Sequence, residues 1–331
     1  MMKAKIDRIA YYLPPGILGN EELADRFPEW LVNNVAEKTG INTRHLSGSD
    51  EFVSDMAIES SRHLFEKYSI DPNTIDFLLL CTQSPDYFLP TTSCIVQEKL
   101  GLKNSCGAFD FNLGCSGYIY GLGVAKGLIE TNQATNVLLL TSETYTKHIE
   151  KNDKGNLAIF GDAATATLMS SSNKESLHSF VFGTDGKGAD KLIVRNGAMR
   201  HPKTFQDAGG KVDEENYLYM NGPEIFSFTL LRVPELVRQT LEKANLSLNQ
   251  IDLFVFHQAN KFMLEHIRTK IGIDADRFYF YLSEVGNTVS STIPIALANA
   301  IEESRLVPGM RAMLVGFGVG YSWGACILEI S

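Results

Sequence analysis

The stretch IDLFVFH at residues 251–257 repeats an earlier one, IDFLLLC at residues 75–81, and each copy ends on a residue capable of chemistry. Both copies are short, continuous apolar runs, which is the pattern of strands buried on both faces of a sheet. The repeat continues downstream, because the turns GCS at 114–116 and GNT at 286–288 each open an apolar helical run that a matching strand follows. The chain is therefore predicted to contain a duplicated strand–helix–strand unit.

This duplication brings three polar residues into one expected site. Cys115 and Asn287 fall at equivalent predicted helix starts, and His257 lies at the carboxyl end of a buried strand, where open α/β sheets bind ligands. A thiol at a helix N-terminus is close to the positive end of the helix dipole, which favours the thiolate. Taken singly, each residue has an ordinary alternative: a buried cysteine, a structural histidine and a helix cap. The duplication favours a shared site.

A glycine-rich stretch, GFGVGYSWG at 316–324, follows the strand expected at 313–315. Alternating glycines allow the backbone to bend and to direct amide groups at a developing oxyanion, although a plain hairpin turn has the same composition. The other four cysteines lack the setting of Cys115 and are expected to be buried: Cys81, Cys94, Cys106 and Cys326.

Composition limits the classes of function. The chain has 331 residues, of which 44% are hydrophobic and 21% charged, as in an ordinary soluble globular protein. Its net charge of −9 argues against general nucleic-acid binding but leaves room for a basic patch that binds an acidic protein. We expect no membrane span and no signal peptide, because long apolar runs are missing. Five scattered cysteines without a metal-ligand pattern indicate a cytoplasmic protein with free thiols and no metal site.

The local pattern predicts several elements and two halves. A helix is expected from Asn20, with its side chain as the cap, and further helices are expected over 54–68 and 221–244. Alternating strands and helices indicate an α/β protein. The expected halves, 1–172 with the cysteine and 173–331 with the histidine and asparagine, have no low-complexity linker between them and should share a core.

These motifs resemble those of the β-ketoacyl-acyl-carrier-protein synthase III family, the initiating condensing enzymes of the thiolase superfamily. The likeness runs essentially from end to end, and the Cys, His, Asn order distinguishes this branch from its relatives. Besides the turns at Cys115 and Asn287 and the terminal glycine-rich stretch, it rests on EWLV at 29–32, TGI at 39–41, IFGDAA at 159–164, MNGPEIF at 220–226 and HQAN at 257–260. It implies the thiolase fold, in which two duplicated βαβαβαββ halves pack as a five-layered α-β-α-β-α core.

The resemblance also implies a mechanism. Cys115 would attack an acyl-CoA and hold the acyl group as a thioester. The amides of Cys115 and of Gly318 or Val319 would stabilise the tetrahedral oxyanion. His257 and Asn287 would bind the thioester oxygen of malonyl-acyl-carrier protein and stabilise the enolate that decarboxylation leaves. Such a reaction needs no metal and no redox cofactor.

Four residues are implied to contact CoA or its pantetheine arm: Trp30, Lys38, Lys154 and Asn260. Lys38 and Lys154 stand where the family has arginines, and lysine keeps the charge but loses the two-pronged hydrogen bonding to phosphate. This departure favours a specialised, pathway-specific branch. Three residues are implied to dock the carrier protein: Lys261, Arg268 and Lys270.

The family implies a homodimer in which a loop of one subunit reaches the acyl pocket of the other. The matching loop, SPDYFLPT at 84–91, carries three bulky apolar residues, Tyr87, Phe88 and Leu89. Exposure of all three in a turn would be unusual, so we expect burial against a partner subunit. The alternative is packing on their own subunit. Leu89 would line the partner's acyl pocket, and Phe317 is implied to line the pocket as well.

Two other functions fit the same residues. An acyltransferase of this fold would pass the acyl group to an oxygen or nitrogen nucleophile without decarboxylation, with His257 as general base. A catalytically silent partner subunit would only bind acyl chains or an active relative. The presence together of Cys115, His257 and Asn287 argues against the silent subunit.

Overall fold

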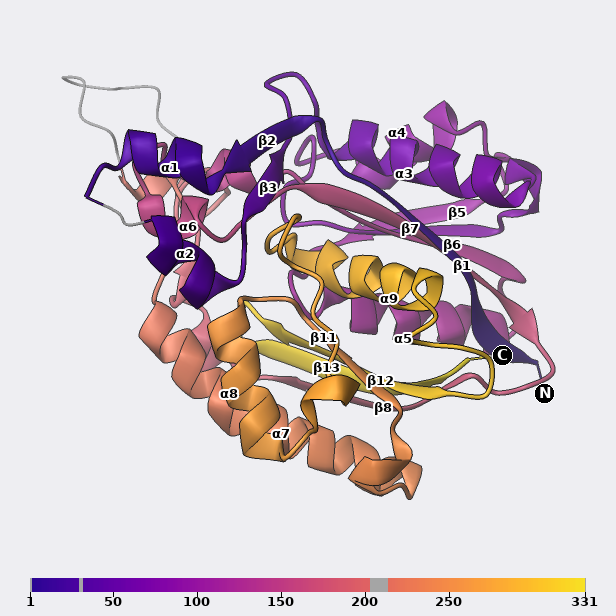
Figure 1. Ribbon diagram of the computed structural model, residues 1–331. Coiled ribbons are helices and arrows are strands. Elements are labelled where there is room, and N and C mark those ends of the chain that lie inside the picture. The colour runs from indigo at the N-terminus through magenta and orange to yellow at the C-terminus, as the bar shows by residue number, and fades with distance from the viewer. Residues whose placement is uncertain (1, 30–31, 203–213, 331) are drawn as a thin grey trace.

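The computed structural model describes residues 2–29, 32–202 and 214–330, and two packed β-sheets organise them (Figure 1). In the first sheet β4 lies between β6 and β5 and is parallel to both, whereas β7 runs antiparallel to β6 and β1. Its strands, in spatial order, are β1 (Lys3–Tyr12), β7 (Ala163–Ser172), β6 (Asn136–Glu143), β4 (Phe77–Cys81) and β5 (Gly107–Phe111).

The second sheet repeats this arrangement with one strand fewer. Its strands, in spatial order, are β11 (Leu253–Phe256), β12 (Arg311–Gly318), β13 (Ser322–Glu329) and β8 (Leu177–Thr184). β11 is parallel to β12 as β4 is to β6, so the two similar apolar runs occupy equivalent places. The expected fifth strand is reduced to a single parallel bridge between Phe254 and Phe278, which corrects the prediction of two complete halves.

The helices complete five layers (Figure 1). Two lie between the sheets, α5 (Gly117–Glu130) and α9 (Thr292–Glu302). The outer face of the first sheet is covered by α3 (Val53–Tyr68) and α4 (Thr92–Lys99), and that of the second by α7 (Gly222–Ala244) and α8 (Lys261–Ile271). The predicted thiolase-type α/β fold is thereby confirmed in its layer order.

One hydrophobic cluster joins the two halves. It contains Tyr118 and Leu122 from α5, Ile293 and Leu297 from α9, and inward-facing residues of both sheets. The division at residue 172 falls at the last residue of β7 and stays a prediction. Because one core serves both sheets, separate folding of either half is not expected.

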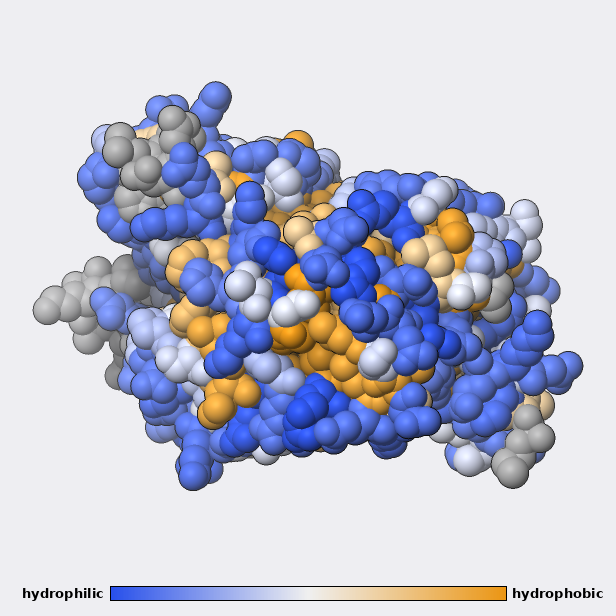
Figure 2. All heavy atoms as spheres, turned by 60° about the horizontal axis from the view of Figure 1, so that its bottom comes forward, coloured by the Kyte–Doolittle hydropathy of each residue, from blue (hydrophilic) through white to orange (hydrophobic). Residues whose placement is uncertain are grey.

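The remaining elements lie mainly around one end of the sheets. They are β2 (Gly16–Gly19), β3 (Thr43–Leu46), α1 (Asn20–Arg26), α2 (Val32–Thr39), α6 (Lys154–Leu157), β9 (Leu192–Ile193) and β10 (Tyr219–Met220). No helix within the described ranges is both long and apolar enough to cross a bilayer. On the face shown in Figure 2, apolar atoms gather near the middle and hydrophilic atoms surround them. Areas of this kind often mark contact surfaces.

The three predicted helices are confirmed, since α1 begins at Asn20, but one capping prediction is wrong. The helices expected at 54–68 and 221–244 are α3 and α7, and the Asn221 side chain accepts a hydrogen bond from the Glu224 amide at the start of α7. Asn20, however, does not cap α1. Its amide group donates to the Ile41 carbonyl and its oxygen accepts from the buried Arg44, so this side chain ties two segments together.

Candidate active site

Cys115, His257 and Asn287 line one cavity of about 470 Å³, which Phe317 and Gly318 also line. The three side chains are nearly buried, with exposed fractions of 6%, 2% and 5%. The rest of the wall is mostly apolar, from residues such as Ile159, Leu192, Met220, Ile225 and Met263. An apolar pocket with a few convergent polar groups is the expected form of a small-molecule site.

Glycines bring the β12–β13 hairpin into contact with the Cys115 turn. A Cβ atom on Gly318 would lie 2.9 Å from the Cys115 sulfur, and one on Gly316 would lie 2.8 Å from the Ser116 Cα. Any larger side chain would push the hairpin away. Within the fully described stretch 316–324, Gly320 alone has a left-handed φ, 126°. The glycines therefore serve close packing more than the bending expected from the sequence.

Burial keeps the Cys115 thiol protonated at neutral pH, against the thiolate that the helix dipole was expected to favour. Burial raises the thiol pKa to about 12, and the nearby Glu143 carboxylate acts in the same direction. Hydrogen bonds from the amides of Cys115 and Val319 lower the pKa without offsetting the burial. Of the two candidate hairpin amides, Val319 is the one that lowers the pKa of the Cys115 thiol.

His257 follows β11 and is held through its backbone amide and its imidazole ring. Its amide donates to the Val315 carbonyl, and its Nδ1 lies 2.8 Å from the Thr292 hydroxyl oxygen. Burial lowers the imidazole pKa to about 3, so the ring is neutral at neutral pH. The Thr292 hydroxyl is also 3.1 Å from the Val289 carbonyl. The single Thr292 proton can go to that carbonyl or to His257 Nδ1. If it goes to Nδ1, the imidazole proton is on Nε2, which then donates; otherwise Nδ1 carries the proton and Nε2 accepts.

Asn287 is oriented by the turn that follows it. Its side-chain oxygen accepts a hydrogen bond of 3.0 Å from the Val289 amide, which leaves Nδ2 as the donor group. Val289 has a φ of 56°, an unusual value for a β-branched residue. α9 begins only at Thr292, after a 3₁₀ turn, so Asn287 is not at the helix start that the duplication predicted. Its side chain nevertheless lines the same cavity as Cys115.

Glu143 is a buried residue that the sequence reasoning missed. Its carboxyl accepts hydrogen bonds from the Ser290 hydroxyl at 2.7 Å, the Gln83 amide at 3.0 Å and the Ser84 hydroxyl at 3.2 Å. Burial nevertheless raises the carboxyl pKa to about 8. The sequence did contain a sign of this residue: Glu143 ends the apolar run that forms β6, and the carboxyl ends of strands are where open α/β sheets bind ligands.

The residues implied to bind CoA are in different situations. Asn260 lines the cavity, but its side-chain oxygen accepts from the Met263 amide and caps α8. Lys154 forms an ion pair of 3.0 Å with Glu29, so a phosphate would compete with that carboxylate. Lys38 is exposed on α2, and Trp30 lies outside the described residues. Of the three that the structure describes, only Asn260 lines the cavity.

The three residues implied to dock a carrier protein differ as well. Lys261 and Lys270 are exposed on α8. The Arg268 side chain instead pairs with Glu265 at 2.7 Å and donates to the Ile273 carbonyl at the end of the helix. Its guanidinium is therefore engaged within the chain, and its role in docking stays a prediction.

The loop 84–91 projects its apolar residues away from the chain. Leu89 is 83% exposed, and Tyr87 and Phe88 are also exposed. Packing on their own subunit, one of the two alternatives above, is therefore wrong. Leu89 does not line the cavity of its own chain, whereas Phe317 does. Among the other cysteines, Cys81 and Cys326 are buried as expected, but Cys106 is half-buried and Cys94 is exposed.

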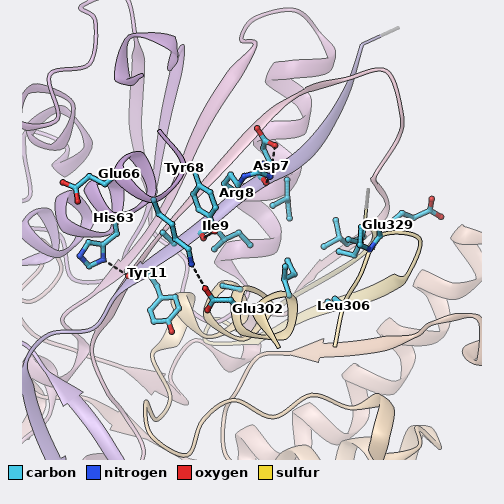
Figure 3. A pocket seen from close by; sticks show the side chains of 18 residues that line it. Asp7, Arg8, Ile9, Tyr11, His63, Glu66, Tyr68, Glu302, Leu306 and Glu329 are labelled. Atoms are coloured by element: carbon cyan, nitrogen blue, oxygen red, sulfur yellow. Dashed lines mark hydrogen bonds and ion pairs between the residues drawn. The ribbon is translucent and has the colours of Figure 1, made fainter. Parts of the chain in front are cut away.

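A larger cavity of about 930 Å³ lies elsewhere, between β1, α3 and the segment around α9 (Figure 3). Four of its charged groups pair within the lining: Lys67 with Glu302, and Arg8 with Asp7. His63 bonds the Tyr11 carbonyl through Nδ1. Among the described residues lining it there is no cysteine, so this cavity offers no counterpart of the Cys115 site.

The chain matches two family models in its two halves. Residues 109–186 match the model described as 3-oxoacyl-[acyl-carrier-protein] synthase III, and residues 241–330 match that of its C-terminal part. A β-ketoacyl-[acyl-carrier-protein] synthase III of Clostridium perfringens is 36% identical over the full length of both chains. The chain belongs to the β-ketoacyl-acyl-carrier-protein synthase III family. One from Neisseria gonorrhoeae is 33% identical over 99% of this chain and all of that one.

Solved structures agree with membership of the synthase III family. A crystal structure of a 3-oxoacyl-(acyl-carrier-protein) synthase III superposes with a TM-score of 0.96 at 44% identity, covering 99% of this chain and all of that one. The priming β-ketosynthase of the R1128 polyketide pathway gives 0.88 at 25% identity, covering 99% and 97%. The predicted family, fold and general function are confirmed: this is a condensing enzyme of fatty-acid or polyketide biosynthesis.

Proposed function

We propose that this synthase III joins an acyl group taken from acyl-CoA to malonyl-acyl-carrier protein, with loss of carbon dioxide, and forms a 3-oxoacyl product. The observation that carries the proposal is the meeting of Cys115, His257 and Asn287 in one apolar cavity. A cysteine can hold the acyl group, the other two can hold an enolate, and the apolar wall suits an acyl chain.

In the first half-reaction the Cys115 sulfur attacks the thioester carbonyl of acyl-CoA. The carbonyl oxygen becomes an oxyanion, and the amides of Cys115 and Val319, both of which favour negative charge on the sulfur, donate hydrogen bonds to it. The C–S bond to CoA then breaks, and the CoA sulfur leaves with the proton that the Cys115 thiol loses. Because burial makes that thiol a weak acid, transfer of its proton must accompany the attack.

In the second half-reaction the malonyl carboxylate leaves as carbon dioxide, and its bonding electrons form an enolate. Asn287 Nδ2 and His257 Nε2–H donate hydrogen bonds to the enolate oxygen, provided that the Thr292 hydroxyl donates to His257 Nδ1. The enolate carbon attacks the acyl thioester on Cys115, the carbon–sulfur bond breaks, and the sulfur regains a proton from solvent.

Exposed and cavity-lining residues of the chain suggest where the carrier protein, a second subunit and CoA would bind. Lys261 and Lys270 lie exposed on α8, which also supplies Met263 to the cavity wall, so an acidic carrier protein bound there would be close to the entrance. The exposed residues of loop 84–91 support a homodimer in which Leu89 reaches the partner's acyl pocket. Lys38, Lys154 and Asn260 are the described residues proposed to bind CoA.

The test uses two separate measurements on the intact protein. Mass spectrometry after incubation with a panel of acyl-CoAs should show one acyl group on the peptide that contains Cys115. Labelled malonyl-acyl-carrier protein should then release labelled carbon dioxide and give a 3-oxoacyl product. Acylation without carbon dioxide release, followed by transfer to an alcohol or amine, would replace this proposal with a non-decarboxylating acyltransferase.

A further inference from the structure

Two buried serines connect the nucleophile turn to the hairpin turn. The Ser116 and Ser322 hydroxyl oxygens lie 2.7 Å apart, and the Ser322 hydroxyl donates a hydrogen bond of 2.8 Å to the Val319 carbonyl. Each hydroxyl has one proton. Because the Ser322 proton goes to Val319, the proton between the two serines comes from Ser116. Ser116, the residue after Cys115, is thus linked through Ser322 to the carbonyl of Val319, whose amide is proposed above to bind the oxyanion.

The turn between β12 and β13 consists of residues 319–321, and the Ser322 hydroxyl holds its first residue, Val319. At the other end, Tyr321 and Asp185 exchange two backbone hydrogen bonds of 2.9 Å. Gly320, between Val319 and Tyr321, has the left-handed φ described above, so the chain turns sharply there. Ser322 is the first residue of β13, and its hydroxyl holds the Val319 carbonyl, so it restrains the backbone of the residue that carries the amide.

We propose that Ser322, oriented by Ser116, is a positioning residue that keeps the Val319 amide directed at the oxyanion formed on the Cys115 thioester. This inference rests on the roles proposed above for Cys115 and Val319. It assigns Ser322 to the steps at the Cys115 carbonyl, whereas malonyl decarboxylation uses His257 and Asn287, which the serine pair does not contact.

The expected effect follows from the geometry of such donors. Removing one oxyanion donor typically lowers the rate by about 10²–10³. Loss of the Ser322 hydroxyl leaves the amide present but less well placed, so we expect acylation to slow by about tenfold to a hundredfold. Ser116→Ala should have a smaller effect, because Ser322 can still donate to Val319.

The experiment compares Ser322→Ala, Ser322→Thr and Ser116→Ala with the wild type. Single-turnover acylation of Cys115 by acyl-CoA is followed by mass spectrometry, and carbon dioxide release from malonyl-acyl-carrier protein is measured without an acyl donor. Ser322→Ala should slow acylation and leave carbon dioxide release within about threefold, since His257 and Asn287 are untouched. Ser322→Thr keeps a hydroxyl and should restore most of the acylation rate.

A second readout is independent of the substrates. The Val319 amide favours the Cys115 thiolate, so Ser322→Ala should slow alkylation of Cys115 by iodoacetamide at fixed pH, while alkylation of the exposed Cys94 stays unchanged. Equal loss of both half-reactions, or no loss of either acylation or alkylation, would overturn the positioning role. A wild type that never acylates Cys115 would instead overturn the proposed function.

Discussion

The Glu143 carboxyl, from the first half of the chain, accepts a hydrogen bond of 2.7 Å from the Ser290 hydroxyl in the second half. Ser290 belongs to the turn that orients Asn287, and Glu143 also binds the Gln83 amide and the Ser84 hydroxyl at the root of the exposed loop. One buried carboxyl therefore ties the turn beside Asn287 to the loop expected to contact the partner.

Glu143 predicts a pH dependence of stability. Burial raises its pKa from 4.5 to about 8 in the folded protein, so the folded state binds the proton more tightly than the unfolded state between these values. Stability from this group is therefore lost as pH rises from about 4.5 to 8, with a slope of at most about 1.4 kcal/mol per pH unit. Glu143→Gln removes the titration. Urea unfolding at pH 5, 6, 7 and 8 should show the variant gaining on the wild type as pH rises; parallel pH profiles would contradict the raised pKa.

Cys115→Ala should abolish formation of the acyl-enzyme while leaving the fold intact. The sulfur is the proposed nucleophile, and alanine is a smaller side chain at a position outside any regular helix. Intact-mass measurement after incubation with acyl-CoA gives the readout, and thermal unfolding checks the fold. Cys94→Ala is the matched control, because that cysteine is exposed, and it should acylate normally. Acyl mass on the Cys115→Ala protein would assign the nucleophile to another residue.

His257→Ala and Asn287→Ala should slow carbon dioxide release more than acylation of Cys115. Each variant loses one proposed donor to the enolate, and such a donor is typically worth about 10²–10³ in rate. Labelled malonyl-acyl-carrier protein measures release, and single-turnover mass spectrometry measures acylation. If both half-reactions fell equally in His257→Ala, the histidine would be a general base, as in the non-decarboxylating alternative.

Thr292→Val should reproduce part of the His257 defect. Valine has nearly the same shape as threonine but no hydroxyl, so His257 Nδ1 loses its partner at 2.8 Å and the ring no longer has a defined tautomer. We expect carbon dioxide release to fall by about tenfold, a smaller loss than removal of the ring. Thr292→Ser keeps the hydroxyl and is the rescue control; a Thr292→Ser protein as slow as Thr292→Val would point to packing instead.

Leu89→Phe should shorten the preferred acyl chain. Added volume in the partner's pocket would exclude methylene groups, each worth about 0.8 kcal/mol when buried. Sedimentation should first show a dimer, and a panel of acyl-CoAs then gives the chain-length profile. Leu231→Phe is the matched control, since this leucine is exposed on α7, and it should leave the profile unchanged. A monomer would contradict the dimer, and an unaltered profile in the folded variant would contradict the role of Leu89.

The sequence predicted the strands and the three central residues because buried parallel strands are apolar runs that can be recognised locally. The two runs at β4 and β11 gave the duplication, and the duplication selected Cys115, His257 and Asn287. The fifth strand of the second half could not be judged in this way. Phe278 lies in an apolar stretch but forms only one bridge, which depends on its neighbours in space.

Contacts between side chains far apart in the sequence could not be predicted from local sequence patterns. Nothing local indicates that Ser116 meets Ser322, or that Glu143 meets Ser290. The state of the Cys115 thiol was mispredicted for a similar reason. The helix dipole is a local feature, whereas burial depends on the whole fold and here has the larger effect on the pKa.

The protonated state of Cys115 has a consequence for survival under oxidative stress. Peroxides and electrophilic metabolites attack thiolates that they can reach, and susceptibility follows thiolate character and exposure. Cys115 is nearly buried and burial raises its thiol pKa, so we expect its sulfur to react with such reagents more slowly than an exposed thiol would. The exposed sulfur of Cys94 is the more vulnerable one, and its oxidation would leave the nucleophile intact.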